Sequence, residues 1–394
     1  MAKVRLSEVV ARIKDKVNPS ELTYYIGGEH FEYGAVTVDK KAAIAGSTIG
    51  PAFHIRFKPG DVLLMSRNPH LRKAGMVDFE GLCSDVSYVC RAKDDSVLLQ
   101  SFLPFIFQSD DFWKFAEANK KGSTNFFLNW SDFEKYEFSL PPLAEQKKLA
   151  ETLWAMERVK HAYKKLLAET DALAQARFVE MFGDPVKNDK GWPIKGLLDI
   201  GYCKNGLNFG PNESGCDLYC VGVGDFKDRN VIDDVSCLSK ISVNEKPSDE
   251  LLLRDGDILF VRSNGNKALV GRSLVINVGD EAVAFSGFCI RFRKTSCDIE
   301  LAFLANYLRV PVVRRLLQGR GANIQNLNQQ TMAQLKIPLP PLALQREFAA
   351  FIAQQEKAKA SLKESLAALT VAQKALMNSS FAKATDDKRA CKDL

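Results

Sequence analysis

The chain has 394 residues, of which 46% are hydrophobic and 26% charged, and its formal net charge is +6 at pH 7. That length and apolar content allow two or three domains with buried cores, which excludes a disordered tail or linker. No apolar run approaches the roughly 18 residues of a membrane-spanning helix, and the amphipathic N-terminal segment lacks the apolar centre of a signal peptide. We therefore expect a cytoplasmic protein with no membrane partner, and a charge excess that permits an anionic partner such as nucleic acid.

Cysteine and histidine usage predicts neither a disulfide framework nor a metal site. The nine cysteines are odd in number, and no two of them have C-x-x-C spacing. Cys216 and Cys220 are the closest pair, but no second ligand pair lies near them, and the four histidines show no ligand spacing. We expect buried or unreactive thiols and no bound metal.

Residues 1–138 are predicted to form a mixed globular domain. Short runs rich in β-branched and aromatic residues, such as DVLLM from Asp61 and VSYVCRA from Val86, are separated by Gly, Asn, Asp and Pro. These runs indicate strands joined by exposed loops.

Residues 139–183 are predicted to form a long helix. The prolines of Leu-Pro-Pro-Leu fix an extended start, and the residues that follow contain no Gly or Pro until Gly183. A narrow apolar stripe at three- and four-residue spacing favours a two-helix seam over an ordinary surface helix, although the latter stays open. The stripe consists of Leu149, Leu153, Met156, Val159, Tyr163, Leu166 and Leu173.

Residues 184–337 and 338–381 are predicted to repeat this arrangement. DILFVRS from Asp257 and FCIRFR from Phe288 indicate strands of a second domain, and a second long helix follows Leu339-Pro340-Pro341-Leu342. Its stripe consists of Phe348, Ile352, Leu362, Leu366, Leu369 and Leu376. Each helix of about 40 residues would be roughly 60 Å long at 1.5 Å per residue. Residues 382–394 are expected to be a disordered tail.

An internal duplication explains this order. SLPPLAEQKKLA at 139–150 returns as PLPPLALQREFA at 338–349, an offset of 199 residues that also places Gly122 on Gly321. PGDVLLMSRN from Pro59 matches DGDILFVRSN from Asp255, and CSDVSYVCR from Cys83 matches FSGFCIRFR from Phe285 more loosely. Four landmarks in one order indicate two divergent modules in tandem.

The motifs of an enzyme acting on DNA are not found. There is no G-x-x-x-x-G-K-[ST] loop, and GVGDF from Gly222 lacks the third glycine of a dinucleotide fingerprint. RNPH from Arg67 has one proline and no aromatic residue, unlike the usual amino-methyltransferase motif. Glu145 and Lys147 have E-x-K spacing, but the second copy has Leu344 in place of the glutamate, which favours a structural role. We expect a chain without catalysis of its own.

Two modules, each closed by a helix that starts LPPLAEQ or LPPLALQ, resemble the specificity subunit of type I restriction-modification systems. ALMNSSF near the end of the second helix, beside ARFVEMFG at the end of the first, and the repeated G-D-[VI]-L strand starts extend the resemblance over nearly the whole chain. One departure is Phe126 and Phe127, which follow GSTN where polar or aliphatic residues are expected.

The resemblance implies a mixed α/β (α+β) fold with two target-recognition domains, separated by two long helices that form an antiparallel coiled coil. It also implies double-stranded DNA, two DNA adenine methyltransferase subunits and a restriction and translocase subunit as partners. S-adenosylmethionine, ATP and magnesium would belong to those partners, and this chain would hold no cofactor. Because the domains differ, each is expected to read its own half of an asymmetric target, with the gap set by helix length.

Polar and basic residues of the loops beside the repeated strands are the candidate DNA contacts, because Arg, Lys and Asn pair with base edges or phosphates. In the first domain they are Arg67, Asn68, His70, Arg72, Lys73, Lys120, Lys121, Thr124 and Asn125. In the second they are Arg262, Asn264, Asn266, Lys267, Arg320, Asn323, Gln325 and Asn328. The alternative from another class is a tandem-module coiled-coil adaptor that binds proteins instead of DNA.

Overall fold

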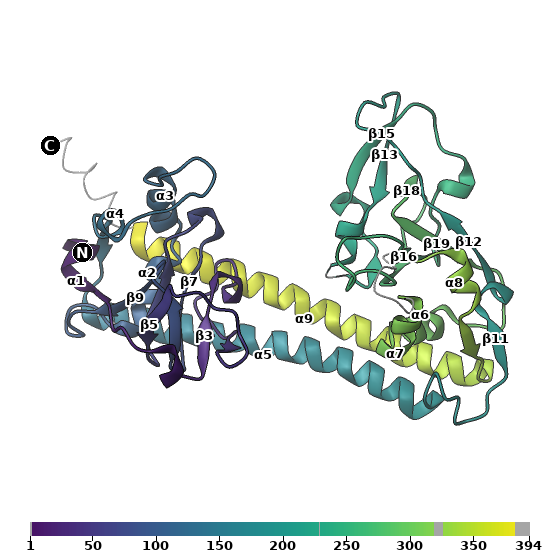
Figure 1. The fold of residues 1–394 in the computed structure, drawn as a ribbon, viewed down its shortest axis with the longest axis horizontal. Coiled ribbons are helices and arrows are strands. Elements are labelled where there is room, and N and C mark those ends of the chain that lie inside the picture. Colours follow the sequence, from purple (N-terminus) through teal and green to yellow (C-terminus); the bar gives the residue numbers. More distant parts are fainter. Residues whose placement is uncertain (1, 228, 319–325, 383–394) are drawn as a thin grey trace. The chain divides into compact units, whose positions relative to one another are not determined.

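The computed structural model describes residues 2–227, 229–318 and 326–382, and Figure 1 shows its ribbon with many of the helices and strands labelled. Contacts between residues divide the chain into two compact units. Unit 1 comprises residues 1–164 and 363–394, and unit 2 comprises residues 165–362. Part of each long helix therefore belongs to each unit. The predicted tail lies, from residue 383 onwards, outside the described residues.

The described part of unit 1 contains three sheets and four short α-helices beside the long ones. The sheet orders are β2-β9-β6-β7, β4-β3-β8-β5 and β1-β10. The strands are β1 (Ala2–Arg5), β2 (Val10–Ile13), β3 (Tyr24–Ile26), β4 (Ala42–Ala43), β5 (Phe53–Phe57), β6 (Val62–Met65), β7 (Ala74–Met76), β8 (Gly81–Ser84), β9 (Ser87–Ala92) and β10 (Glu137–Leu140). The globular part also has the single-turn α1 (Leu6–Val9) and the helices α2 (Leu103–Phe107), α3 (Asp110–Ala118) and α4 (Trp130–Phe133).

The described part of unit 2 follows the same plan. Its sheet orders are β12-β19-β16-β17-β14, β15-β13-β18 and β11-β20. The strands are β11 (Ile194–Gly196), β12 (Gly201–Asn205), β13 (Cys216–Val221), β14 (Val231–Ile232), β15 (Ser239–Val243), β16 (Ile258–Val261), β17 (Ser273–Ile276), β18 (Val283–Phe285), β19 (Cys289–Lys294) and β20 (Lys336–Pro338). The short helices are α6 (Leu301–Arg309), α7 (Pro311–Leu317) and α8 (Gln329–Ala333).

The strands predicted from the repeated runs are confirmed as β6, β9, β16 and β19. β6 pairs antiparallel with β9, and β16 pairs antiparallel with β19. All four residues of both β6 and β16 are buried, which is why these strands have continuous apolar runs instead of alternating ones. The order β2-β9-β6-β7 matches β12-β19-β16-β17, and β4-β3-β8 matches β15-β13-β18, while β5 of unit 1 and β14 of unit 2 are additions. The shared orders confirm the duplication inferred from the sequence.

A buried aspartate directly before β6 and before β16 explains why Gly-Asp is repeated in the two units. Asp61 is 2% exposed and forms a two-pronged ion pair with Arg91, in which the Nη2–Oδ2 distance is 2.9 Å. Asp257 is 1% exposed and accepts from Nε and Nη2 of Arg293 at 2.7 Å each. The bond to Asp257 raises the pKa of Arg293, because the carboxylate stabilises the charged guanidinium.

The two long helices are α5 (Leu143–Phe182) and α9 (Leu342–Ala382). In unit 1 the start of α5 is fixed by Gln146, which is 1% exposed. Its Nε2 donates to the carbonyls of Val97 at 2.8 Å and Pro141 at 2.9 Å, and its Oε1 accepts from the backbone N–H of Leu99 at 3.0 Å. One side chain thus satisfies three backbone groups where the helix meets its domain.

In unit 1 the first half of α5 packs against the second half of α9 through polar groups. Lys160 Nζ donates to Glu157 Oε2 at 2.9 Å and to Gln373 Oε1 at 2.8 Å. Gln373 is 3% exposed, and its Nε2 donates to the carbonyl of Leu153 at 3.3 Å. The seam in this unit therefore has a hydrogen-bonded network at its centre.

In unit 2 the second half of α5 packs against the first half of α9, so the two helices run in opposite directions, as predicted. Lys359 is 7% exposed and donates to Asp171 Oδ1 at 2.7 Å and Glu356 Oε1 at 2.9 Å. Burial alone would lower the pKa of Lys359, but the two carboxylates outweigh it and hold the pKa above its usual value.

Three residues of the predicted apolar stripe lie outside the buried seam. Val159, Leu166 and Leu173 are 43%, 45% and 51% exposed. Each directly precedes a half-buried residue of the same helix, namely Lys160, Leu167 and Ala174, and successive residues of an α-helix are about 100° apart, so all three lie beside the buried face and not on it. Leu153 and Phe348 are buried, and the other predicted members are half-buried, namely Leu149, Met156, Tyr163, Ile352, Leu362, Leu366, Leu369 and Leu376.

Candidate nucleic-acid interface

The first predicted cluster in unit 1 is a loop that leaves the sheet after β6. Asn68 and Arg72 have left-handed backbones, with φ of 51° and 45°, on either side of a short 3-10 turn at Pro69–Leu71. Asparagine tolerates this region, whereas arginine rarely adopts it. The sharp turns leave Arg67 and His70 exposed.

The second predicted cluster of unit 1 lies beside the first. Lys121 and Phe127 exchange two backbone hydrogen bonds, of 2.8 and 3.0 Å, around a turn in which Gly122 has φ of 90°. Phe127 also pairs with Arg67, and the N–H of Asn68 donates to the carbonyl of Phe126 at 2.8 Å. The two phenylalanines that depart from the expected pattern therefore join the two loops, and Thr124 and Asn125 are exposed on the turn.

Several cations of unit 1 already have partners in the chain. Lys120 Nζ lies 2.7 Å from Glu117 and 4.3 Å from the ring centre of Phe126, and Lys121 Nζ lies 2.7 Å from Asp132. The lysine holds the pKa of the Asp132 carboxyl below its usual range. Lys73 Nζ donates to the carbonyl of Gly28 at 2.6 Å.

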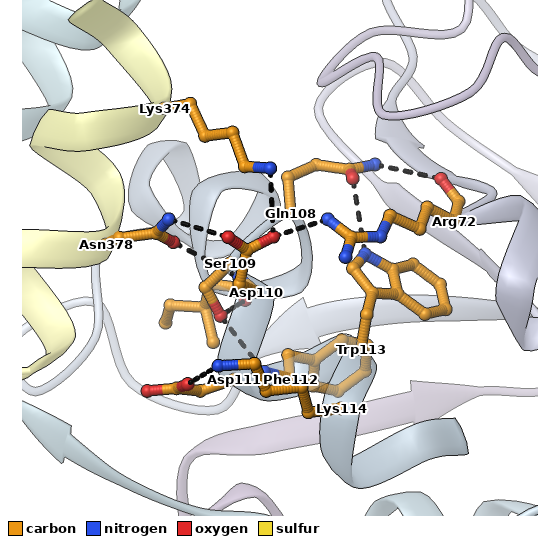
Figure 2. Close-up of polar contacts among 11 residues, drawn as sticks. Arg72, Gln108, Ser109, Asp110, Asp111, Phe112, Trp113, Lys114, Lys374 and Asn378 are labelled. Atoms are coloured by element: carbon orange, nitrogen blue, oxygen red, sulfur yellow. Dashed lines mark hydrogen bonds and ion pairs between the residues drawn. The ribbon is translucent and has the colours of Figure 1, made fainter. Parts of the chain in front are cut away.

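Arg72 is fixed by Asp110, with 2.5 Å between Nη1 and Oδ1 (Figure 2). Asp110 also accepts from Asn378 at 2.8 Å and lies 3.3 Å from Lys374 Nζ, both on α9. Arg72 therefore ties its loop to α9 within unit 1. Arg67 makes no ion pair with any described residue, which leaves it with His70, Thr124 and Asn125 as the predicted contacts most open to a ligand.

The loop after β16 occupies the same position in unit 2. Arg262 Nη1 donates to the carbonyl of Gly287 at 3.2 Å, and the backbone carbonyl of Arg262 accepts from Leu327 at 2.7 Å. Asn264 accepts from the N–H of Asn266 at 2.8 Å. The asparagine thus shapes the turn on which Lys267 is exposed.

The second predicted set of unit 2 is only partly described. Arg320, Asn323 and Gln325 lie outside the described residues. Asn328 is the N-cap of α8, where its Oδ1 accepts from the N–H of Thr331 at 2.8 Å. Its oxygen thus has a structural partner in the chain.

Neither a metal site nor a membrane-spanning helix is present in the described part of the chain. Residues 2–227, 229–318 and 326–382 contain no cluster of three or more His, Cys, Asp or Glu side chains able to hold a metal ion. Within the same ranges, no helix combines the length and apolar character needed to cross a lipid bilayer.

Two related units, each with a polar loop after its central strand and each carrying half of two long antiparallel helices, define a binding protein built by internal duplication. Both halves match the family described as Type I restriction modification DNA specificity domain, over residues 13–169 and 232–371. These matches cover well over half of the chain, and the chain belongs to this family.

Individual relatives agree with this assignment. The chain is 27% identical over 233 residues to the "Type I restriction enzyme StySPI specificity subunit" of Salmonella potsdam, a match that covers 55% of this chain and 50% of that protein. The chain thus spans about half the length of this relative.

Two solved structures share the fold. One is the "Type-I restriction-modification system S subunit from M. genitalium", with a TM-score of 0.55 and 16% identity, and the match covers 96% of both chains. The other belongs to a structure described as the "complex assembly and conformational transition of the type I R-M system", with a TM-score of 0.54, 21% identity and 96% coverage of both chains.

Proposed function

We propose that this chain is the DNA sequence-recognition subunit of a type I restriction-modification complex. Residues 1–138 and 184–337 form two target-recognition domains, and residues 139–183 and 338–381 form the helices between them. Each domain reads one half of an asymmetric target in the cytoplasm, where the DNA lies. The observation that carries the proposal is the family match to both halves, each of which includes an exposed polar loop at the same place after its central strand.

The chain supplies recognition, and its partners supply catalysis. Base edges are read by side chains such as Arg67 and Arg262, while nearby amides and lysines contact phosphates and fix the register. Methyl transfer, with S-adenosylmethionine, belongs to two adenine methyltransferase subunits, and DNA cleavage with ATP and magnesium belongs to a translocating restriction subunit. The relatives named as specificity subunits support this division of labour.

The exposed apolar residues of α5 support a role of the helices as partner-binding surfaces. Val159, Leu166 and Leu173 leave a line of aliphatic area in water on a helix whose buried face lies elsewhere. Such area on an ordered helix favours a protein partner. The methyltransferase subunits are the partners that we propose for this surface.

Co-expression with the methyltransferase subunit tests this function. The two chains are expected to co-purify, and the complex is expected to methylate adenines in one split sequence that neither chain modifies alone. Mapping the methylated positions gives both half-sites and the gap between them. A complex that forms without sequence-specific retention of duplex DNA would favour the adaptor instead.

A further inference from the structure

The two units differ in whether a carboxylate balances the positive charges beside the short helices α3 and α7. In unit 1, Asp110 is the first residue of α3, and its carboxylate receives Arg72, Lys374 and Asn378 (Figure 2). The chain thus neutralises this group of cations with its own carboxylate. The repeat allows the same position to be found in unit 2.

Two sets of contacts fix the correspondence. Leu99 and Glu300 donate the same backbone hydrogen bond to Gln146 and Gln345, and they are 201 residues apart. The same offset places Asp110 on Pro311, the first residue of α7. It also places Gln108, which donates to the carbonyl of Ala35 at 2.8 Å, on Arg309, which donates to the carbonyl of Asn230 at 2.7 Å. Unit 2 therefore has a proline where unit 1 has the neutralising carboxylate.

A cavity of about 330 Å³ occupies this region of unit 2. Arg272, Arg309 and Arg314 line it, together with Lys359 and the two carboxylates, Asp171 and Glu356, with which that lysine is paired. Four cations and two anions leave the lining with a charge of +2. The three arginines make no ion pair with any residue in the described ranges.

The arginines are also incompletely hydrogen-bonded. Nε of Arg309 and Nε of Arg314 are buried and have no acceptor in the described chain. Burial lowers the pKa of both guanidinium groups and the charge of Arg272 lowers it further, while Glu356 and Asp171 offset part of this effect at Arg309. Buried cations in excess of their counter-charges are costly, so this arrangement favours binding of an anion.

We infer that this cavity in unit 2 binds a phosphate group. A phosphate monoester carries about −1.5 to −2 charges at pH 7, close to the +2 of the lining, whereas a single carboxylate would leave an excess cation. Guanidinium groups are suited to phosphate because their planar N–H donors match its oxygens. Arg314 of the lining donates to the carbonyl of Ala268, next to the loop after β16, but none of the proposed base-reading residues lines the cavity. The site therefore does not depend on the proposed function.

Chemical denaturation of the full chain in increasing inorganic phosphate tests the site, with sodium chloride at matched ionic strength as the control. At a phosphate concentration ten times the dissociation constant, the unfolding constant of the wild type is expected to fall about 11-fold. Arg272→Gln loses no ion pair, so the variant is expected to fold but to lose the phosphate effect. Arg272 corresponds to Lys73 of unit 1, because their carbonyls accept the equivalent N–H groups of Val261 and Met65. Arg272→Lys, which installs the residue of unit 1, should retain most of the phosphate effect. Arg254→Gln, at an exposed arginine of unit 2, should behave as wild type.

Two results would overturn the site. One is a phosphate effect no larger than that of chloride, and the other is an effect that persists in Arg272→Gln. Two further ligands distinguish the sources of the phosphate, each compared between wild type and Arg272→Gln. Stabilisation by adenosine monophosphate assigns the site to a free phosphate ester, as the charge match predicts. Stabilisation only by a duplex without terminal phosphates, in which each diester carries a single charge, assigns the cations to the DNA backbone and contradicts the monoester.

Discussion

Gln146 and Gln345 make the same three hydrogen bonds in their own units. Each donates twice through Nε2, once to the carbonyl of a proline five residues earlier and once to a loop carbonyl, and accepts one backbone N–H through Oε1. Both side chains are fully or almost fully buried, at 1% and 0% exposure. The glutamine of the Leu-Pro-Pro-Leu-Ala-x-Gln motif thus joins each long helix to its domain.

Replacing this glutamine is expected to destabilise the unit to which it belongs. Gln345→Leu removes three hydrogen bonds and leaves buried backbone groups without partners, which should cost about 3 kcal/mol of unfolding free energy. Urea denaturation measures the loss. Gln175→Leu, at an exposed position of α5, is the control and should change stability by less than about 0.5 kcal/mol. Equal stability of the two variants would show that the glutamine contacts contribute little.

The buried aspartates are expected to contribute about as much to the unfolding free energy as these glutamines. Asp257→Asn removes the charge that balances Arg293 and weakens a two-pronged pair at 2.7 Å, so a loss of about 3 kcal/mol is expected. Asp255→Asn, two residues earlier, is the comparison, because Asp255 is exposed and accepts only backbone N–H groups of Val278 and Gly279. The prediction is contradicted when the second variant loses as much stability as the first.

Asp110 is expected to make unit 1 sensitive to acid. Burial would raise the pKa of its carboxyl, but Arg72, Asn378 and Lys374 together hold the pKa below the ordinary value of 3.8. A carboxyl with a lowered folded pKa adds stability above its unfolded pKa, and this stability is lost as the pH falls through the folded value. Between about pH 5 and pH 3 the unfolding free energy of wild type should therefore fall more steeply than that of Asp110→Asn. Parallel pH profiles for the two proteins would rule out this role.

The fold was predictable where local patterns decide it. β-branched runs predicted β6 and β16, the prolines and Gly183 predicted the ends of α5, and the repeat predicted that both units share one plan. Gly183 has φ of 81°, a conformation that favours glycine at a helix end. The polar contacts between the two long helices were not predictable. Lysine is usually solvent-exposed on a helix, and Lys160 and Lys359 are buried only because they contact residues far away in the sequence.

The sequence predicted which loops form the candidate site better than it predicted which residues of those loops are open to a ligand. The sequence placed both polar clusters of unit 1, but it did not show that Phe126 and Phe127 bring them together. Nor did it show that Arg72 has a carboxylate partner 38 residues away. The repeated motifs are 199 residues apart, and this offset does not align Asp110 with Pro311. The hydrogen bonds of Gln146 and Gln345 show that the local offset is 201 residues, which does align them.

Charge reversal in the loop after β16 is expected to weaken specific DNA binding by the assembled complex. Arg262→Glu with Lys267→Glu would remove the base contact and the phosphate contact that we propose for this loop, at an expected cost of about 1 to 3 kcal/mol for the base alone. The salt dependence of binding should also become shallower, by about one unit per lost phosphate contact. Lys240→Glu with Lys246→Glu changes the net charge equally at exposed positions of the same unit and serves as the control. Equal affinities for the two variants across salt concentrations would remove this loop from the interface.

Leu166 and Leu173 are expected to contribute to assembly and not to folding. Both are about half exposed, so Leu166→Glu with Leu173→Glu should leave the unfolding free energy within about 0.5 kcal/mol of wild type. The same change places two charges in the surface that we propose for the methyltransferase subunit, and co-purification with that subunit should fall at least about tenfold, because burying unpaired charge in an interface is costly. Ala168→Glu with Ala172→Glu adds the same charge at exposed positions of α5 where little apolar area is lost, and should assemble normally. If both double variants assemble as wild type does, α5 binds its partner through another face, and these leucines are only solvent-exposed residues of a long helix.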